Sequence, residues 1–395
     1  MLNFTYYNPT RIVFGKGTIP EVKNLVPEKA KVMLTFGGGS IRRNGVYDQI
    51  MHALKGRRLI EFGGIEPNPR YETCMKAVAQ VKAEGVDFLP AAGGGSVIDG
   101  TKFIAAAAKY AGPEPWDLLR DWSLIRDALP LGTVLTLPGT GSEMNGGAVV
   151  SREATTEKLY FLSELTYPRF SILDPETTFT LPDRQFASGT VDAYVQVLEQ
   201  YLTYDVDAPL QDRFSEGILL TLLAEAPKVQ ADPRNYNARA NLMWCATNGL
   251  NGWIACGQPQ DWASHMIGHE LTALYGVYHG QSLAIVMPGV MHHQRGRKRK
   301  KLLQYAERVW GLAGGEESRI DEAIARTEEF FRSLGVGTRL ADYRIPAESA
   351  SLVAARLAQR KMLLGEHQDI GRQEVEQILS LRVAADINAV KDGHW

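Results

Sequence analysis

The chain of 395 residues carries 43 lysines and arginines against 45 aspartates and glutamates, so its formal net charge is −2. Hydrophobic residues make up 45% and charged residues 22%, a composition typical of folded soluble proteins that excludes a largely disordered chain. The balanced charge predicts no nucleic-acid partner, and no apolar segment is long enough to predict a membrane span. The three cysteines are few and widely spaced, which predicts neither disulfides nor a thiolate metal site and favours a reducing cytoplasm.

The first half of the chain alternates β-prone apolar segments with helical patterns. Helical spacing of apolar residues predicts a helix over residues 69–84. The predicted strands are residues 31–36, 86–92, 133–137 and 170–173. Strands that are separated by helices are typical of parallel βαβ units.

The pattern becomes almost entirely helical after residue 180. The predicted helices are residues 185–202, 209–225, 238–249, 261–275, 300–310 and 320–334. We therefore expect an α/β domain with a parallel sheet at residues 1–180, followed by an all-helical domain at residues 181–395.

One short motif occurs twice in the first half: GGGS follows a predicted strand at residues 37–40 and again at 93–96. Glycine lets backbone N–H groups approach a phosphate, and the start of a helix adds partial positive charge. A glycine cluster can also be a simple tight turn, but two matching junctions could hold a dinucleotide. The spacing is neither G-x-G-x-x-G nor that of a P-loop.

Five of the eight histidines lie between His265 and His293. His265 and His269 share one helix face at a spacing of four residues, and His279 follows beyond Gly276, where the helix should end. The three could be hydrogen-bonded structural residues, but together they favour a metal or catalytic site. The order H-x-x-x-H-E differs from H-E-x-x-H, which excludes a metalloprotease motif.

A carboxylate would complete such a site for Fe(II) or Zn(II). Asp192 is a candidate, and Gln196 lies one helical turn beyond it, so both side chains can point the same way. Taken alone, Asp192 near the start of a predicted helix is better interpreted as an acid that the helix dipole favours.

Eight segments together resemble a known family across essentially the whole chain. They are NPTRIVFGKG (8–17), FGGGSIRRNG (36–45), FGGIEPNP (62–69), GGGSVIDGTKFIAAA (93–107), TLPGTGSEMNGGAVVS (136–151), DRFSEGILLTL (212–222), PQDWASHMIGHELTALYG (259–276) and KLLQYAERVW (301–310). With them the chain resembles the iron-containing (group III) alcohol dehydrogenases, in the branch of NADPH-dependent aldehyde reductases and butanol dehydrogenases. That resemblance implies a dinucleotide domain followed by a helical metal domain.

The resemblance implies a divalent metal, Fe(II) or Zn(II), held by Asp192, residue 196, His265 and His279. The family usually has histidine at position 196, where this chain has Gln196. An amide oxygen is a weaker ligand for these ions, so we expect a loosely held metal. His269 is implied as the proton relay, and Asp192 as a catalytic residue that orients the metal.

The resemblance also implies an NADP(H) site in the first domain. The implied cofactor-binding residues are Gly37, Gly38, Gly39, Ser40, Asn68, Gly94, Gly95, Ser96, Asp99, Thr136, Thr140, Asn145 and Lys158. The first glycine turn has no aspartate to repel a 2′-phosphate, and Arg42 and Arg43 follow it, so charge favours NADP. These two arginines can equally be a solvated helix start.

The implied reaction is reversible reduction of a small aldehyde to a primary alcohol. An alternative is a dinucleotide-binding protein whose metal site Gln196 has impaired. A lyase like dehydroquinate synthase would need a more basic pocket than the apolar surroundings of the histidines suggest. Strand candidates at residues 3–7 and 11–14 leave an edge through which related enzymes dimerise, so we expect a homodimer. The basic residues 295–301 are interpreted as a solvated helix face.

Overall fold

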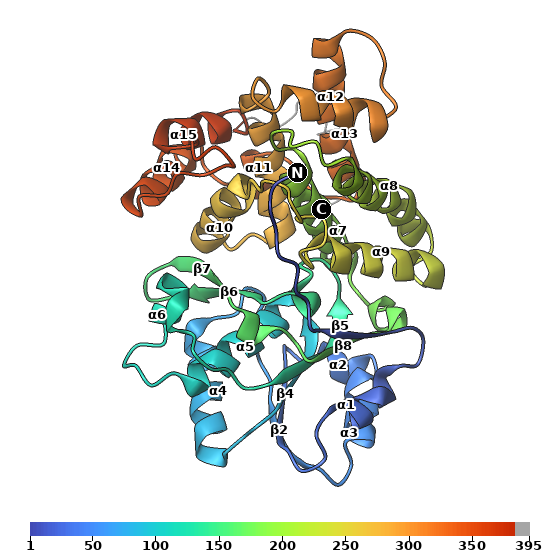
Figure 1. Ribbon diagram of the computed structural model, residues 1–395, viewed down its shortest axis with the longest axis vertical. Coiled ribbons are helices and arrows are strands. Elements are labelled where there is room, and N and C mark those ends of the chain that lie inside the picture. The colour runs from blue at the N-terminus through green and yellow to red at the C-terminus, as the bar shows by residue number, and fades with distance from the viewer. Residues whose placement is uncertain (384–395) are drawn as a thin grey trace. The chain divides into compact units, whose positions relative to one another are not determined.

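The computed structural model describes residues 1–383, which form two compact units (Figure 1). The first unit comprises Tyr6–Pro182 and Lys228–Gly252. The second comprises Met1–Thr5, Asp183–Pro227 and the described residues from Trp253 onward. The chain enters the second unit close to the boundary expected at 180/181, whereas residues 228–252, expected in the second domain, belong to the first unit.

A parallel sheet of six strands is the centre of the first unit, as the alternating pattern predicts. In spatial order the strands are β1 (Arg11–Phe14), β8 (Phe170–Leu173), β5 (Leu131–Leu137), β4 (Leu89–Gly94), β2 (Lys31–Phe36) and β3 (Arg58–Phe62). All pairings in this sheet are parallel. The prediction of a strand at residues 3–7 is wrong, because those residues have no β-pairing in the structure. Strand β4 begins at Leu89 rather than residue 86 and continues through Gly94, with a register shift at Gly93/Gly94.

Helices and one hairpin complete the first unit. The hairpin pairs β6 (Gly147–Arg152) with β7 (Glu157–Leu162) in antiparallel register. The helices are α1 (Val22–Leu25), α2 (Ser40–Arg43), α3 (Val46–Ala53), α4 (Tyr71–Glu84), α5 (Gly95–Lys109), α6 (Asp117–Arg120) and α9 (Tyr236–Gly249). Helix α5 is the most deeply buried of these, since its residues from Val97 to Ala107 are buried on every side. Its N-terminus therefore has a fixed position at the end of β4.

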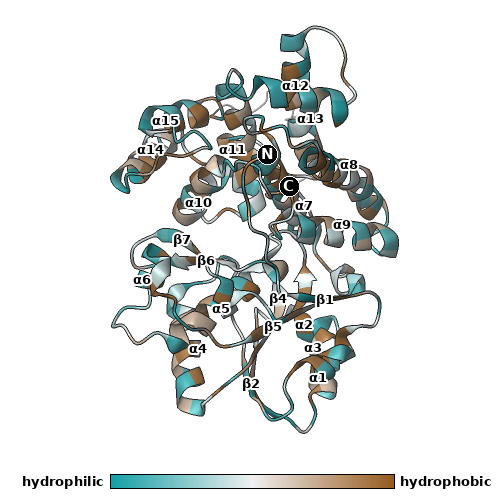
Figure 2. Ribbon diagram, viewed as in Figure 1, coloured by the Kyte–Doolittle hydropathy of each residue, from teal (hydrophilic) through white to brown (hydrophobic). Residues whose placement is uncertain are grey.

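The second unit is built of helices, which confirms the predicted fold class. They are α7 (Asp183–Tyr201), α10 (Ala263–Tyr275), α11 (His279–His293), α12 (Arg299–Arg308), α13 (Glu316–Ser333), α14 (Ser349–Gln359) and α15 (Arg372–Ser380). Helix α8 (Pro209–Ala231) begins in this unit and ends in the first. Individual helices such as α13 show both teal and brown residues in Figure 2, as amphipathic helices should. Within residues 1–383 no helix is long and apolar enough to cross a membrane.

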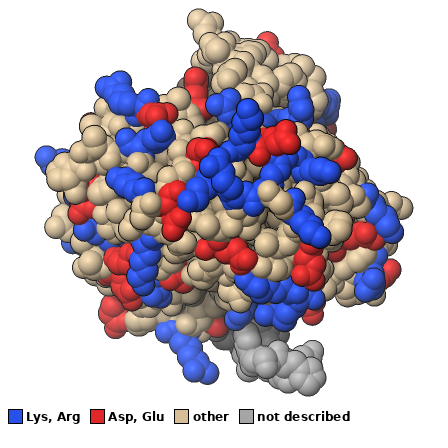
Figure 3. All heavy atoms as spheres, turned by 90° about the horizontal axis from the view of Figure 1, so that it is seen from below, with Lys and Arg blue, Asp and Glu red and all other residues tan. Residues whose placement is uncertain are grey.

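The basic segment 295–301 is paired with acidic residues, and the expectation of a solvated face is wrong for two of its lysines. Lys298 and Lys301 are buried, and their ammonium groups lie 2.7 Å from Glu366 and 2.5 Å from Asp212. The exposed Arg299 pairs with Glu316 at 2.6 Å. Figure 3 shows basic and acidic side chains interspersed on the face in view.

Candidate metal and cofactor sites

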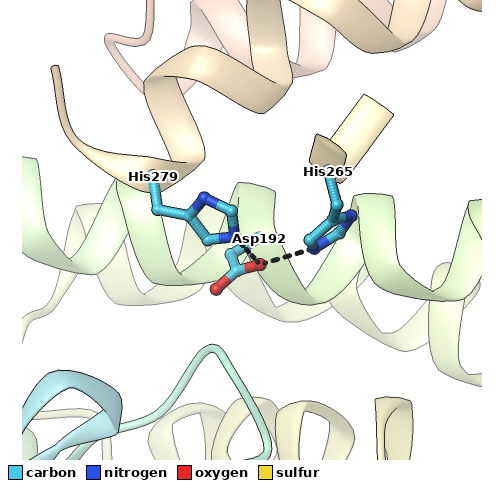
Figure 4. A group of neighbouring side chains, drawn as sticks. All are labelled: Asp192, His265 and His279. Atoms are coloured by element: carbon cyan, nitrogen blue, oxygen red, sulfur yellow. Dashed lines mark ion pairs between the residues drawn. The ribbon is translucent and has the colours of Figure 1, made fainter. Parts of the chain in front are cut away.

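Three helices of the second unit bring one carboxylate and two imidazoles together. Asp192 comes from α7, His265 from α10 and His279 from the first turn of α11. Gly276, with a φ of 68°, ends α10 and lets the chain turn back, so that His279 lies beside Asp192, as His265 does. Both histidines point at one oxygen of Asp192 (Figure 4): Nε2 of His265 lies 3.6 Å and Nε2 of His279 lies 3.7 Å from Oδ1.

This donor set fits a divalent transition metal. One ligand atom from each of the three residues lies within 4.8 Å of the others, so a small inward shift of the side chains would let all three bind one ion. Nε2 of His265 is buried and has no hydrogen-bond partner among the described residues. A buried ring nitrogen without a hydrogen bond, aimed at a carboxylate, is an atom that a metal would satisfy.

Gln196 reaches the same site, but with its nitrogen. Its side chain is buried, and Nε2 donates a 2.8 Å hydrogen bond to Oδ1 of Asp192. The carbonyl oxygen Oε1 is buried without a hydrogen-bond partner in the described structure. Because only the oxygen can bind a metal, Gln196 would have to turn its amide over to act as a ligand.

His269 lies one turn along α10 from His265 and is also buried. Its ring centroid is 5.3 Å from that of His279 and 6.3 Å from that of His265. The structure therefore brings the three predicted histidines together, with His269 beside the group formed by Asp192, His265 and His279.

Glu199 is a member of this site that the sequence analysis missed. It is fully buried on α7, and its Oε2 contacts Nδ1 of His265. Burial lowers the pKa of His265, but the nearby carboxylates of Glu199 and Asp192 outweigh it and raise that pKa to about 9. The sequence spacing could have identified Glu199, because it lies seven residues after Asp192 and therefore on the same helix face.

The first glycine turn, at Gly37–Ser40, joins β2 to α2 in the first unit. Gly39 has a φ of +92°, a conformation that favours glycine, and a Cβ at Gly38 would meet open space. Arg42, which was expected to favour a 2′-phosphate, pairs instead with Glu61 at 2.7 Å and lies over the ring of Tyr47. Its charge is thus already partly compensated within the unit.

The second glycine turn joins β4 to α5 and is tightly enclosed. A Cβ at Gly95 would lie 2.3 Å from Oγ1 of Thr140, and a Cβ at Gly94 would lie 2.8 Å from Leu137. Thr136 is buried on the neighbouring strand β5. A side chain at Gly94 or Gly95 would therefore overlap its neighbours, so this turn requires glycine for close packing.

Three of the expected cofactor residues form one chain of hydrogen bonds beside this turn. The backbone N–H of Asn68 donates to Oγ of Ser96 at 3.1 Å, and Nζ of Lys158 donates to Oδ1 of Asn68 at 2.8 Å. Asn68 has a φ of +58°, which asparagine tolerates better than most residues. The structure thus places the backbone N–H of Asn68 against Ser96 and the buried ammonium group of Lys158 against the side chain of Asn68.

Asp99 and Asn145 are connected through Lys102, a second residue that the sequence analysis missed. Asp99 accepts hydrogen bonds from Oγ of Ser142 at 2.5 Å and from the N–H of Val149 at 3.0 Å. Nζ of Lys102 donates to both the backbone and the side-chain oxygens of Ser142 and Asn145. Burial lowers the pKa of Lys102 to about 8, against the opposing charge of Asp99. Asp99 and Lys102 therefore hold the loop that carries Thr140 and Asn145.

Comparison with known protein families identifies the family to which the chain belongs. Residues 9–175 match the iron-containing alcohol dehydrogenase family, and residues 186–383 match the C-terminal region of the same family. The chain belongs to the iron-containing alcohol dehydrogenases.

Similar members of the family are named as reductases and dehydrogenases. The NADPH-dependent aldehyde reductase YqhD of Escherichia coli is 54% identical over 376 residues, which cover 94% of this chain and 97% of the relative. A probable NADH-dependent butanol dehydrogenase of Bacillus subtilis is 42% identical over 387 residues, covering 96% and 99%. Both relatives match nearly the whole length of this iron-containing alcohol dehydrogenase. The identities therefore show that it is an enzyme of the family.

Solved structures give the same result for the fold. The crystal structure of E. coli YqhD has a TM-score of 0.95 at 52% identity and covers 96% of this chain and 99% of its own. The NADH-dependent butanol dehydrogenase A of Thermotoga maritima has a TM-score of 0.94 at 37% identity, covering 97% and 99%. The two-part architecture described above is therefore that of the family.

Proposed function

We propose that this protein is a metal-dependent, NADPH-linked oxidoreductase that reduces small aldehydes to primary alcohols and catalyses the reverse oxidation. The observation that carries the proposal is the meeting of Asp192, His265 and His279 in a chain 54% identical to an NADPH-dependent aldehyde reductase. One carboxylate and two imidazoles leave positions open on a divalent ion, as a catalytic site requires.

When bound, a divalent metal, Fe(II) or Zn(II), would polarise the aldehyde carbonyl, and NADPH would supply the hydride. Asp192, His265 and His279 would hold the ion, and Gln196 would add a fourth, weaker contact through Oε1. The ionised carboxylate of Asp192 compensates part of the charge at the site. His269 would return a proton from its ring to the oxygen of the product alcohol.

For the cofactor we propose NADPH over NADH. The turn at Gly37, Gly38 and Gly39 presents no carboxylate to repel a 2′-phosphate, and the relative with the higher identity reported above is named NADPH-dependent. Ser40 is a further proposed contact in the first turn. The remaining proposed contacts lie along the second turn and its neighbours: Asn68, Gly94, Gly95, Ser96, Asp99, Thr136, Thr140, Asn145 and Lys158.

We also propose a cytoplasmic homodimer. Strand β1 is the last strand of the sheet on its side, so its outer edge can pair with a second copy. All three cysteines are buried thiols outside any disulfide, as a reducing compartment allows. Light scattering of the purified protein tests the dimer directly, and a monomer at all concentrations contradicts it.

The function is tested by measuring metal content and aldehyde-dependent oxidation of NADPH with the same preparation. We expect His265→Ala and His279→Ala to lose both metal and turnover while NADPH binding stays nearly unchanged, because the glycine turns lie in the other unit. His269→Ala should keep the metal and lower kcat by about 10²- to 10⁴-fold, the usual contribution of a positioned acid. Full turnover by His265→Ala would contradict the metal assignment.

One observation favours a second candidate: a dinucleotide-binding protein without metal-dependent turnover. As the structure stands, Gln196 turns its amide nitrogen, not its oxygen, toward Asp192. The two candidates differ in a simple titration. If added Fe(II), Mn(II) or Zn(II) produces no aldehyde-dependent oxidation of bound NADPH, the second candidate replaces the first.

A further inference from the structure

We propose that Glu199 is a positioning residue of the metal site: its carboxylate holds His265 in the tautomer whose Nε2 is free to bind the ion. This inference rests on the function proposed above. It concerns a residue that lies outside the group of Asp192, Gln196, His265 and His279.

The two carboxylate oxygens of Glu199 contact different groups: one contacts the backbone at the start of α10, and the other contacts the ring of His265. Oε1 accepts the backbone N–H of Ser264 at 2.6 Å and that of His265 at 3.3 Å. Oε2 contacts Nδ1 of the His265 ring. The side chain is fully buried, so both oxygens depend on these groups rather than on water.

Oε1 replaces an N-cap at the start of α10. The residue at that position, Trp262, has a left-handed φ of 61° and makes no capping hydrogen bond with its side chain. The first N–H groups of a helix need acceptors, and a carboxylate there is also favoured by the helix dipole. Glu199 therefore fixes the backbone that carries His265.

Oε2 fixes the ring itself. A neutral imidazole carries one proton, and an acceptor at Nδ1 keeps that proton there, which leaves the lone pair on Nε2. Nε2 is the nitrogen that lies 3.6 Å from Asp192 and has no hydrogen-bond partner among the described residues. Position and tautomer of one metal ligand thus both depend on one carboxylate.

A buried ion pair between Asp261 and Lys298 lies next to Glu199 and limits the repulsion between the carboxylates of Asp261 and Glu199. Asp261, whose N–H donates to the backbone oxygen of Glu199, lies 3.0 Å from the buried ammonium group of Lys298. Lys298 also contacts Glu366 and donates to the backbone oxygen of Leu202 at 2.7 Å. Because Lys298 compensates Asp261, Glu199 can be held close to the ring of His265.

The test is Glu199→Gln, which keeps the size of the side chain. If the amide oxygen continues to accept from Ser264, the amide nitrogen faces Nδ1 of His265 and forces the ring proton onto Nε2. We expect the apoprotein to bind Zn(II), measured by competition with a chelator, about 10- to 100-fold more weakly than the wild type. Binding of NADPH, measured by its fluorescence, should be unchanged.

Glu199→Asp is the matched variant, because it keeps the charge and both acceptors. We expect its Zn(II) affinity to stay within about fivefold of the wild type. A role limited to capping α10 predicts the opposite order, since Gln keeps the reach to Ser264 and Asp shortens it. Equal Zn(II) affinity of Glu199→Gln and the wild type overturns the inference.

A measurement on the wild type keeps the inference testable if Glu199→Gln does not fold. In ¹⁵N-histidine-labelled protein loaded with ¹¹³Cd(II), we expect cadmium coupling to Nε2 of His265 and a retained proton on Nδ1. Coupling to Nδ1 overturns the inference and leaves the proposed function intact. A wild-type protein that binds neither Zn(II) nor Cd(II) contradicts the proposed function, and the inference with it.

Discussion

The orientation of one amide, that of Gln196, determines how many ligands the metal site offers. With Nε2 directed at Asp192, the site has one carboxylate oxygen and two imidazole nitrogens, and Oε1 has no hydrogen-bond partner in the described structure. Turning the amide over would supply a fourth ligand but would break its hydrogen bond to Asp192, which contributes about 0.5–1.5 kcal/mol.

We therefore predict that Gln196→His raises metal retention and kcat. Position 196 already faces the site, and an imidazole is a better donor for Fe(II) or Zn(II) than an amide oxygen. Metal content after dialysis against a chelator, measured beside NADPH oxidation with a small aldehyde, checks this. Gln196→Leu is the control: if it retains as much metal as the wild type, Gln196 is not a ligand.

Gly38 is the residue at which cofactor preference can be changed with little strain. Its added Cβ meets nothing within 4 Å, and its φ lies outside the left-handed region. We predict that Gly38→Asp shifts the ratio of kcat/KM for NADPH over NADH by about 10- to 100-fold toward NADH, because its charge repels a 2′-phosphate. Gly38→Asn has the same shape without the charge and should shift the ratio far less. Equal shifts in both variants would show that charge is not the cause.

At single residues, the sequence was most informative where residue type and spacing both carry the chemistry. His265, His279 and the glycines have both, whereas Asp192 was chosen through the family resemblance; the structure brings His265, His279 and Asp192 together. Glu199 and Lys102 were missed because an acid or lysine inside a helix looks like a surface residue. Only tertiary packing makes Glu199 a partner of a histidine 66 residues away.

Among the elements, the junction of β4 with α5 is the one with the least room for change. Both of its flanks are packed: α5 is buried along its length, and Thr140 covers Gly95. A methyl group there can be accommodated only by displacing the loop that carries Thr140.

We predict that Gly95→Ala weakens NADPH binding and destabilises the fold by about 1–3 kcal/mol, the usual cost of overpacking. Fluorescence titration with NADPH and thermal unfolding are the measurements. Gly38→Ala, in the first glycine turn but in open space, is the control and should change the melting temperature little. A Gly95→Ala protein with unchanged cofactor affinity would show that this turn is not part of the cofactor site.

The long apolar strands and the amphipathic helices were predictable because hydrophobic periodicity marks them. Strand β3 and the β6–β7 hairpin were missed, since their sequences RLIEF, GAVVSR and EKLYFL mix apolar with charged or small residues. Helix α11 was also missed: with Pro288 inside it, its sequence lacks a clean helical pattern.

For the molecule as a whole, Glu328 is a strong determinant of stability within the second unit. Its carboxylate accepts from the buried guanidinium of Arg382 at 2.8 Å and from Thr338 at 3.0 Å. Burial alone would raise its pKa, but the hydrogen bonds and charges of Arg382, Arg339 and Arg332 lower it below the ordinary 4.5.

We predict that Glu328→Gln costs about 3–5 kcal/mol of unfolding free energy near neutral pH, the loss expected when a buried ion pair is broken. A lowered pKa stabilises the fold fully above the ordinary value of 4.5 and loses that effect as pH falls through the folded-state value. The difference from wild type in denaturant unfolding should therefore shrink below about pH 4.5.

Glu322→Gln is the control for this prediction, because Glu322 pairs with Arg326 on the exposed face of the same helix. It should change stability by less than about 0.5 kcal/mol. If the Glu328→Gln difference stays constant from pH 7 to pH 4, charge is not what Glu328 contributes.

The return of residues 228–252 to the first unit has a consequence for synthesis on the ribosome. Helix α9 supplies Thr247, whose hydroxyl donates to the buried carboxylate of Glu143 at 2.6 Å. Chains are released from the N-terminus, so Glu143 emerges more than a hundred residues before its partner. The first unit is therefore still incomplete when α7, the first helix of the second unit, leaves the exit tunnel, and a fragment ending at Pro182 would lack α9.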